Sequence, residues 1–154
     1  MTIWTPSPEI AVKVIGLAWR GAELLVAEVE ESDGRVKGVR PLGGSIEFGE
    51  TREAALVREF AEELGCAVSV TGPWHTFENL YRHEGAQGHE FIFAAAIRLG
   101  DEQLYRRDRF HYLEHEGTRC CAVWLDPLHL PAGVELYPTG LLDAIEHGGI
   151  RREP

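Results

Sequence analysis

The sequence is short of positive charge. Its 154 residues include 15 lysines and arginines against 25 aspartates and glutamates, which gives a formal net charge of −10. Proteins that bind nucleic acids or anionic membranes rely on lysine and arginine to neutralise phosphates. We therefore expect neither nucleic acid nor a membrane as a partner. A small phosphate ligand remains compatible with this composition, because a bound metal ion supplies positive charge locally.

Long hydrophobic runs and cysteines are also scarce. No apolar run approaches the roughly 20 residues that a membrane-spanning helix needs, and residues 1–6 lack the basic and apolar regions of a secretion signal. The three cysteines fit neither a disulfide framework nor a zinc-ligand spacing. A reducing, cytoplasmic location is therefore expected. The cysteines are Cys66, Cys120 and Cys121.

The chain contains no internal repeat, low-complexity segment or linker rich in glycine, serine or proline. We therefore expect residues 1–154 to form a single domain, long enough to bury a core. Apolar and alternating segments predict strands at 10–19, 23–30, 67–70, 91–99 and 119–125, and a short helix at 139–147. Residues 101–116 are charged and ambiguous. This mixture predicts an α/β (α+β) fold with a mixed β-sheet covered by helices.

The clearest helix is expected at residues 51–64. Thr51 is suited to cap its N-terminus, Glu53 favours the positive end of the helix dipole, and Gly65 is suited to end the helix with a positive φ. The spacing predicts an apolar stripe that faces the core. The stripe consists of Val57, Phe60, Ala61 and Leu64.

Three glutamates, Glu59, Glu62 and Glu63, share one face of this helix because they stand at i, i+3 and i+4. Such a triplet is most often a solvated face. A divalent cation is the alternative, because hard cations prefer carboxylate oxygens. Arg58 is placed to hold an acidic side chain by a bidentate pair.

A glycine-rich loop, predicted at residues 38–49, leads into the helix and makes the metal interpretation stronger. Residues 43–50 read Gly-Gly-Ser-Ile-Glu-Phe-Gly-Glu, and glycines let a backbone turn sharply and approach a ligand. Taken together, the loop and helix resemble the Nudix box, with Cys66 at a final position that is usually aliphatic. The matching positions are Gly44, Glu50, Arg58-Glu59-Phe60, Glu62-Glu63 and Gly65.

The resemblance implies a Nudix αβα sandwich and a Mg²⁺-dependent hydrolase, with Mn²⁺ as a second candidate metal. The expected reaction is cleavage of the pyrophosphate of a nucleoside diphosphate linked to another group: a nucleoside triphosphate, a nucleotide sugar or a dinucleotide. The expected partner is thus a small nucleotide, and a homodimer is compatible with the resemblance. The alternative from another class is a Nudix-like domain that senses a nucleotide without turnover.

The resemblance also assigns roles by position. Glu59 and Glu63 would ligate the metal, with Glu62 a ligand or closely associated and the Gly43 carbonyl completing the set. Arg58 would orient the glutamates, so that Glu59, Glu62 and Arg58 form the catalytic group, with Glu50 supporting Arg58. Gly44, Glu47 and Arg40 would contact substrate, and Glu47 is also suited to a second metal.

The general base is left open between a box glutamate and a later one, among Glu78, Glu84, Glu90, Glu114 and Glu116. A rival is a zinc site on His111 and His115, whose His-x-x-Glu-His spacing pairs two imidazoles if the segment is helical. Aromatic residues after the helix are candidates for stacking on a base, although each is more often a core residue. They are Trp74, Phe77 and Tyr81.

Overall fold

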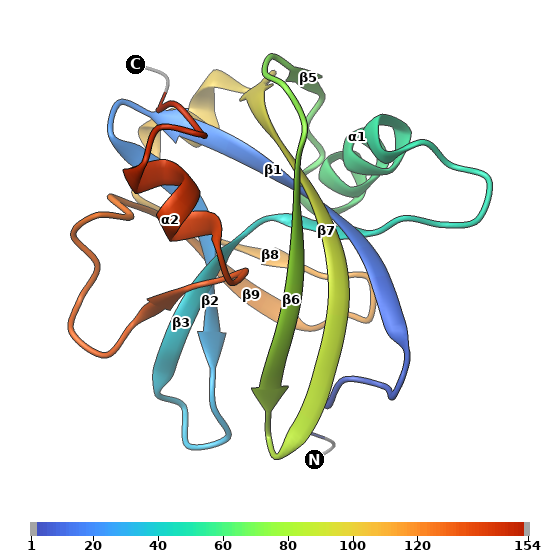
Figure 1. Ribbon diagram of the computed structural model, residues 1–154. Helices are drawn as coiled ribbons and strands as arrows, with labels where there is room; N and C mark the ends of the chain where they lie inside the picture. Colours follow the sequence, from blue (N-terminus) through green and yellow to red (C-terminus); the bar gives the residue numbers. More distant parts are fainter. Residues whose placement is uncertain (1–2, 153–154) are drawn as a thin grey trace.

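The sheet is organised around β1 (Ile10–Arg20), whose side chains point alternately into two apolar clusters. The computed structural model describes residues 3–152. Strand β1 pairs in parallel with β7 (Ala86–Leu99), and antiparallel with β4 (Gly43–Ser45) and with β2 (Glu23–Glu30). Because β1 pairs with β4 in its middle and with β2 only at its end, the sheet splits into two parts along this strand (Figure 1).

One part of the sheet contains β1, β4, β7 and two strands that pair antiparallel with β7. The other contains β2 and the strands beside it, with β10 parallel to β3. Parallel and antiparallel pairs together make this the mixed sheet that the sequence predicted. The remaining strands are β3 (Val36–Pro41), β5 (Val68–Val70), β6 (His75–His83), β8 (Arg109–Leu113), β9 (Arg119–Leu125) and β10 (Glu135–Leu136).

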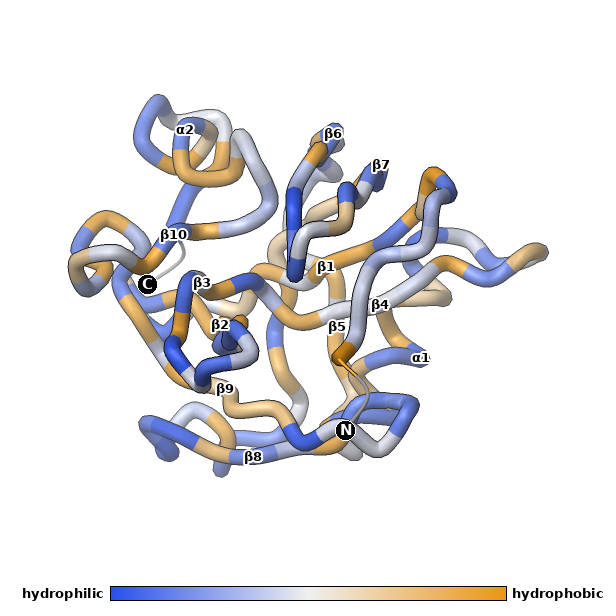
Figure 2. The backbone as a smooth tube through the Cα atoms, turned by 90° about the horizontal axis from the view of Figure 1, so that it is seen from below, coloured by the Kyte–Doolittle hydropathy of each residue, from blue (hydrophilic) through white to orange (hydrophobic). Residues whose placement is uncertain are grey.

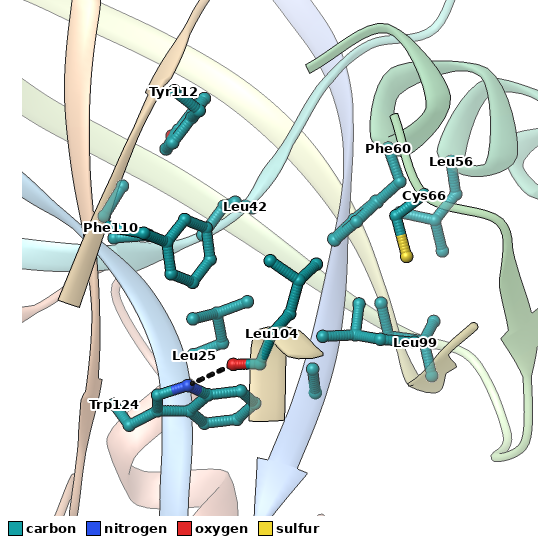
Figure 3. Packing of buried hydrophobic residues seen from close by; sticks show 14 of the residues in the cluster. Leu25, Leu42, Leu56, Phe60, Cys66, Leu99, Leu104, Phe110, Tyr112 and Trp124 are labelled. Carbon is teal, nitrogen blue, oxygen red and sulfur yellow. Dashed lines mark hydrogen bonds between the residues drawn. The ribbon is translucent and has the colours of Figure 1, made fainter. Parts of the chain in front are cut away.

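The two helices lie on opposite sides of the sheet, which confirms the predicted fold class (Figure 2). Helix α1 (Arg52–Leu64) packs into the cluster that contains Phe60 and Trp124. Helix α2 (Leu141–Glu146) packs into the second cluster through Leu141. In the first cluster the indole nitrogen of Trp124 donates to the carbonyl of Leu104 at 3.1 Å (Figure 3). None of the helices in residues 3–152 is both long and apolar enough to cross a membrane.

The apolar stripe predicted for α1 is partly wrong. Val57 is 39% exposed and Ala61 is also exposed, whereas Ala55, Leu56 and Phe60 are buried together with a carboxylate, Glu59. The prediction followed apolar residues alone. The helix instead turns an acidic residue inward, which rotates the buried face away from Val57.

Three other segments differ from their prediction. Strand β6 was not predicted and β7 begins five residues early, because this hairpin carries many polar side chains. More than half of the predicted glycine-rich loop at 38–49 is strand, in β3 and β4. The ambiguous segment 101–116 contains a 3-10 helix (Glu102–Arg106) and β8.

Candidate active site

Helix α1 carries the predicted acidic residues and is capped at both ends. The Thr51 hydroxyl accepts a backbone hydrogen bond from the first turn at 3.1 Å, and Gly65 ends the helix with φ of 61°. These caps satisfy backbone groups that helix ends otherwise leave unpaired. The resulting register turns Glu59 inward, where it is 8% exposed, and leaves Glu62 on the surface.

Two glycines bring β4 against both β1 and the helix. Gly43 and Gly44 pair with Ile15 and Val14. A Cβ on Gly43 would lie 1.9 Å from the Val14 carbonyl oxygen, and one on Gly44 would lie 2.2 Å from Cδ of Glu59. Contacts this short do not occur, so any side chain at these positions displaces its neighbours. The Glu59 carboxylate therefore rests directly against the backbone of Gly44.

Arg58 connects the loop before α1 to the glutamates on it. Its Nε and Nη2 donate to the two oxygens of Glu50 at 2.7 and 2.8 Å, the bidentate geometry expected of arginine. Its Nη1 donates to Glu59 at 3.1 Å and to Glu62 at 3.3 Å, and Nη2 also reaches the Ser45 carbonyl at 3.0 Å. The hydrogen bonds from Arg58 lower the pKa of Glu50 to about 2. One guanidinium thus restrains three carboxylates.

Glu63 lies in an environment that disfavours its charge. Burial and the negative charges of Glu59 and Glu114 together raise the pKa of Glu63 to about 8, and the positive charge of Arg40 opposes them. Negative charge therefore exceeds the positive charge nearby. Closely spaced carboxylates with this excess fit a hard divalent cation such as Mg²⁺ or Mn²⁺.

The carboxylates are not yet arranged around a common point. Among residues 3–152, no three His, Cys, Asp or Glu side chains already stand in a geometry that would ligate a metal ion. In this arrangement Nη1 of Arg58 donates to both Glu59 and Glu62.

The predicted substrate contacts lie on both sides of this cluster. Glu47, on the loop before α1, has a side chain that is 66% exposed, and its Oε1 is 3.9 Å from Arg58 Nη1. Arg40, near the end of β3, forms an ion pair with Glu114. Since the charges of both Arg40 and Glu114 act on Glu63, the structure brings Arg40 to the acidic cluster.

Only one of the later candidate bases is linked to this cluster by the described contacts. Glu114 acts on Glu63, whereas Glu78 pairs with His89 at 2.9 Å and Glu90 is buried against Asn79. Glu84 bonds the backbone of Ser32, and Glu116 lies in an exposed turn. The candidates from sequence therefore reduce to the box glutamates and Glu114.

The structure gives no support to the zinc hypothesis or to base stacking by Trp74 and Phe77. His111 lies on strand β8 and His115 in the turn after it, so the helical pairing of two imidazoles is absent. The guanidinium of Arg52 lies 4.7 Å from the ring centre of Trp74 and occupies one face of that ring. Phe77 packs into the apolar cluster beneath α2.

Tyr112 is a residue of this region that sequence reasoning missed. Strand β8 turns Phe110 and Tyr112 inward and His111 and Leu113 outward. The charges of Arg40, Glu63 and Glu114 all act on the Tyr112 hydroxyl. The alternation of apolar and polar residues in β8 could have predicted that Tyr112 points inward, but the local sequence does not show which residues pack against that inner face.

Comparisons with known proteins place the chain in a family. The NUDIX domain family matches residues 9–138, which contain every box position. No curated protein matches the chain. Among solved structures, a UDP-X diphosphatase is 15% identical with a TM-score of 0.55, and covers 95% of this chain and 67% of its own. A MutT NUDIX hydrolase from Burkholderia pseudomallei is 19% identical with a TM-score of 0.54, covering 80% of this chain and 88% of its own. At these identities the likeness concerns the fold.

Proposed function

Because the chain belongs to the Nudix hydrolase family, we propose that it hydrolyses the pyrophosphate bond of a nucleoside diphosphate linked to another group. The observation that carries this proposal is the Arg58 network, which holds Glu59 and Glu62 beside the partly buried carboxyl of Glu63. Such an excess of carboxylates destabilises a folded chain unless a ligand compensates it. A metal ion bound for the proposed reaction would compensate this negative charge.

Glu59, Glu62 and Glu63, with the Gly43 carbonyl, would hold Mg²⁺ or Mn²⁺. The metal would neutralise phosphate oxygens and lower the pKa of the attacking water. Arg58, backed by Glu50, fixes the orientation of the glutamates through its five hydrogen bonds.

We assign the general base to Glu114, which would accept the proton of the attacking water at a carboxylate oxygen. It is the later glutamate whose charge reaches Glu63, and its ion pair with Arg40 restrains it. Gly44, Glu47 and Arg40 would contact the substrate.

The substrate class stays open among nucleoside triphosphates, nucleotide sugars and dinucleotides. UDP-linked compounds belong in any test, since one structural neighbour is a UDP-X diphosphatase. The three cysteines are all free, which fits our proposal of a cytoplasmic enzyme.

The test is hydrolysis of a panel of these three classes with Mg²⁺, with Mn²⁺ and with EDTA, and product identification by ³¹P NMR. We expect metal-dependent cleavage of the pyrophosphate in one class. Glu59→Gln should reduce turnover at least 100-fold, whereas Glu53→Gln, at an exposed position on the same helix, should not. Tight binding of a nucleotide without turnover would replace this proposal by the sensor function.

A further inference from the structure

The Tyr112 hydroxyl is buried without a hydrogen-bond partner. Its residue is only 6% exposed, and no atom of the described residues meets this oxygen in full hydrogen-bonding geometry; its one weak interaction is with the thiol of Cys120. Burying an unpaired hydroxyl costs free energy, so folded proteins pair nearly all of them with protein, water or ligand. An unpaired hydroxyl beside a candidate active site therefore indicates that its partner arrives from outside the chain.

The surroundings of this hydroxyl define which partner fits. Strand β8 carries Tyr112 beyond Phe110, at the end of the row of buried side chains (Figure 3). The positive charge of Arg40 and the negative charges of Glu63 and Glu114 act on the oxygen. The other neighbour, Cys120, offers only a thiol, which is a weak hydrogen-bonding group.

Tyr112 is suited to donate to an anionic oxygen. Burial raises the pKa of its phenol above its ordinary range, so the hydroxyl keeps its proton at neutral pH. Arg40 adds a guanidinium, and Glu114, to which Arg40 is paired, occupies only part of its five donors. A neutral donor next to a guanidinium favours a phosphate oxygen, while the carboxylates require that this phosphate arrive with a cation.

We propose that the Tyr112 hydroxyl and the Arg40 guanidinium form a phosphate subsite that binds a non-bridging oxygen of the substrate's pyrophosphate group. The proposal rests on the proposed function for the identity of the substrate. It adds Tyr112 to the residues that contact substrate, with a hydroxyl that gains a strong hydrogen-bond partner only when the phosphate is bound.

The test is Tyr112→Phe, which removes only the hydroxyl. Calorimetry with methylenebisphosphonate and Mg²⁺ needs no turnover and reports phosphate binding directly. We expect the dissociation constant to rise at least 10-fold, because a hydrogen bond to a charged oxygen is lost. The melting temperature should stay unchanged or rise by about 2 °C, since the variant no longer buries an unpaired hydroxyl.

Tyr105→Phe is the matched control. The Tyr105 hydroxyl accepts a hydrogen bond from the Leu99 backbone at 2.8 Å, so its loss should lower the melting temperature and leave bisphosphonate binding unchanged. The subsite is refuted if Tyr112→Phe binds bisphosphonate as the wild type does, or if the wild type does not bind it. A lower melting temperature for Tyr112→Phe with unchanged binding would show a purely structural hydroxyl.

Failure of the subsite and failure of the proposed function have different signatures. If the wild type binds bisphosphonate through Tyr112 but hydrolyses nothing in the panel, the subsite is supported and the proposed function is refuted. A wild type that hydrolyses one class, with Tyr112→Phe equal to it in KM, kcat and bisphosphonate binding, retains the function and loses the subsite.

Discussion

Replacing Glu63 by glutamine should make the metal-free protein more stable at alkaline pH. The folded-state pKa of Glu63, about 8, lies above the ordinary value of 4.5. A carboxyl whose pKa is raised on folding contributes stability that is fully present below its unfolded pKa and is lost as pH rises through the folded pKa. The wild type should therefore lose stability between about pH 4.5 and pH 8, and glutamine, which cannot ionise, should not.

The magnitude follows from the shift after a correction for solvent. A difference of this size in a fully buried group would correspond to about 5 kcal/mol. Glu63 is only half-buried, and solvent screens its interactions with neighbouring charges, so we expect about 1 to 2 kcal/mol. For a domain of this length, that corresponds to a melting temperature higher by about 2 to 8 °C.

The assay is thermal unfolding in EDTA at pH 5, 6.5 and 8, for the wild type, Glu63→Gln and Glu53→Gln. The two sites share a helix, but only Glu63 faces the acidic cluster. The wild type and Glu63→Gln should melt together at pH 5 and diverge by pH 8, whereas the difference for Glu53→Gln should not depend on pH. Mg²⁺ at pH 8 should stabilise the wild type more than Glu63→Gln. If the difference in melting temperature between the wild type and Glu63→Gln does not widen with pH, the reasoning is refuted.

Three further variants test the rest of the site. Gly44→Ala drives a Cβ to 2.2 Å from the carboxylate beside it, so turnover should fall at least 100-fold and the melting temperature by several degrees. Gly149→Ala, where the nearest atom to the added Cβ is 3.5 Å away, should change neither. Normal turnover in Gly44→Ala would contradict the packing argument. Glu114→Gln should reduce kcat about 100-fold while Glu116→Gln does not, and equal rates would remove the base from Glu114. The pKa of Glu50 is lowered from its ordinary value of 4.5 to about 2, so its stabilising contribution is present above pH 4.5 and is lost as pH falls toward 2. Acid melts should show the wild type converging on Glu50→Gln over that range, and parallel curves would argue against the ion pair.

The sequence is most informative where a local rule acts alone. Thr51 and Gly65 cap α1 as predicted, because capping depends on a few neighbouring backbone groups. The strands at 23–30 and 119–125 match β2 and β9 because each is bounded by residues that interrupt an apolar run. The bidentate pair of Arg58 follows similarly, since its partner Glu50 is only eight residues away.

Prediction from sequence fails where distant segments decide the outcome. The place of Glu114 beside the acidic cluster could not be predicted, because its partner Arg40 is 74 residues away and the two meet only after β3 and β8 take their places in the sheet. Tyr112 was missed for the same reason. Val57 was wrongly predicted to face the core, because a prediction from apolar spacing does not anticipate that the carboxylate of Glu59 turns inward.

The charge balance of the cluster around α1 supports our proposal that a cation takes part in substrate binding. Six carboxylates surround the guanidiniums of Arg58 and Arg40, which leaves an excess of four negative charges when all are ionised. They belong to Glu47, Glu50, Glu59, Glu62, Glu63 and Glu114. A single proton on Glu63 reduces this excess without removing it. A pyrophosphate group brings further negative charge, so its approach is repelled unless cations bind with it. Ligand binding to the metal-free protein should therefore be weak, and under our proposal the same residues that repel a bare anion would bind it once the metal is present.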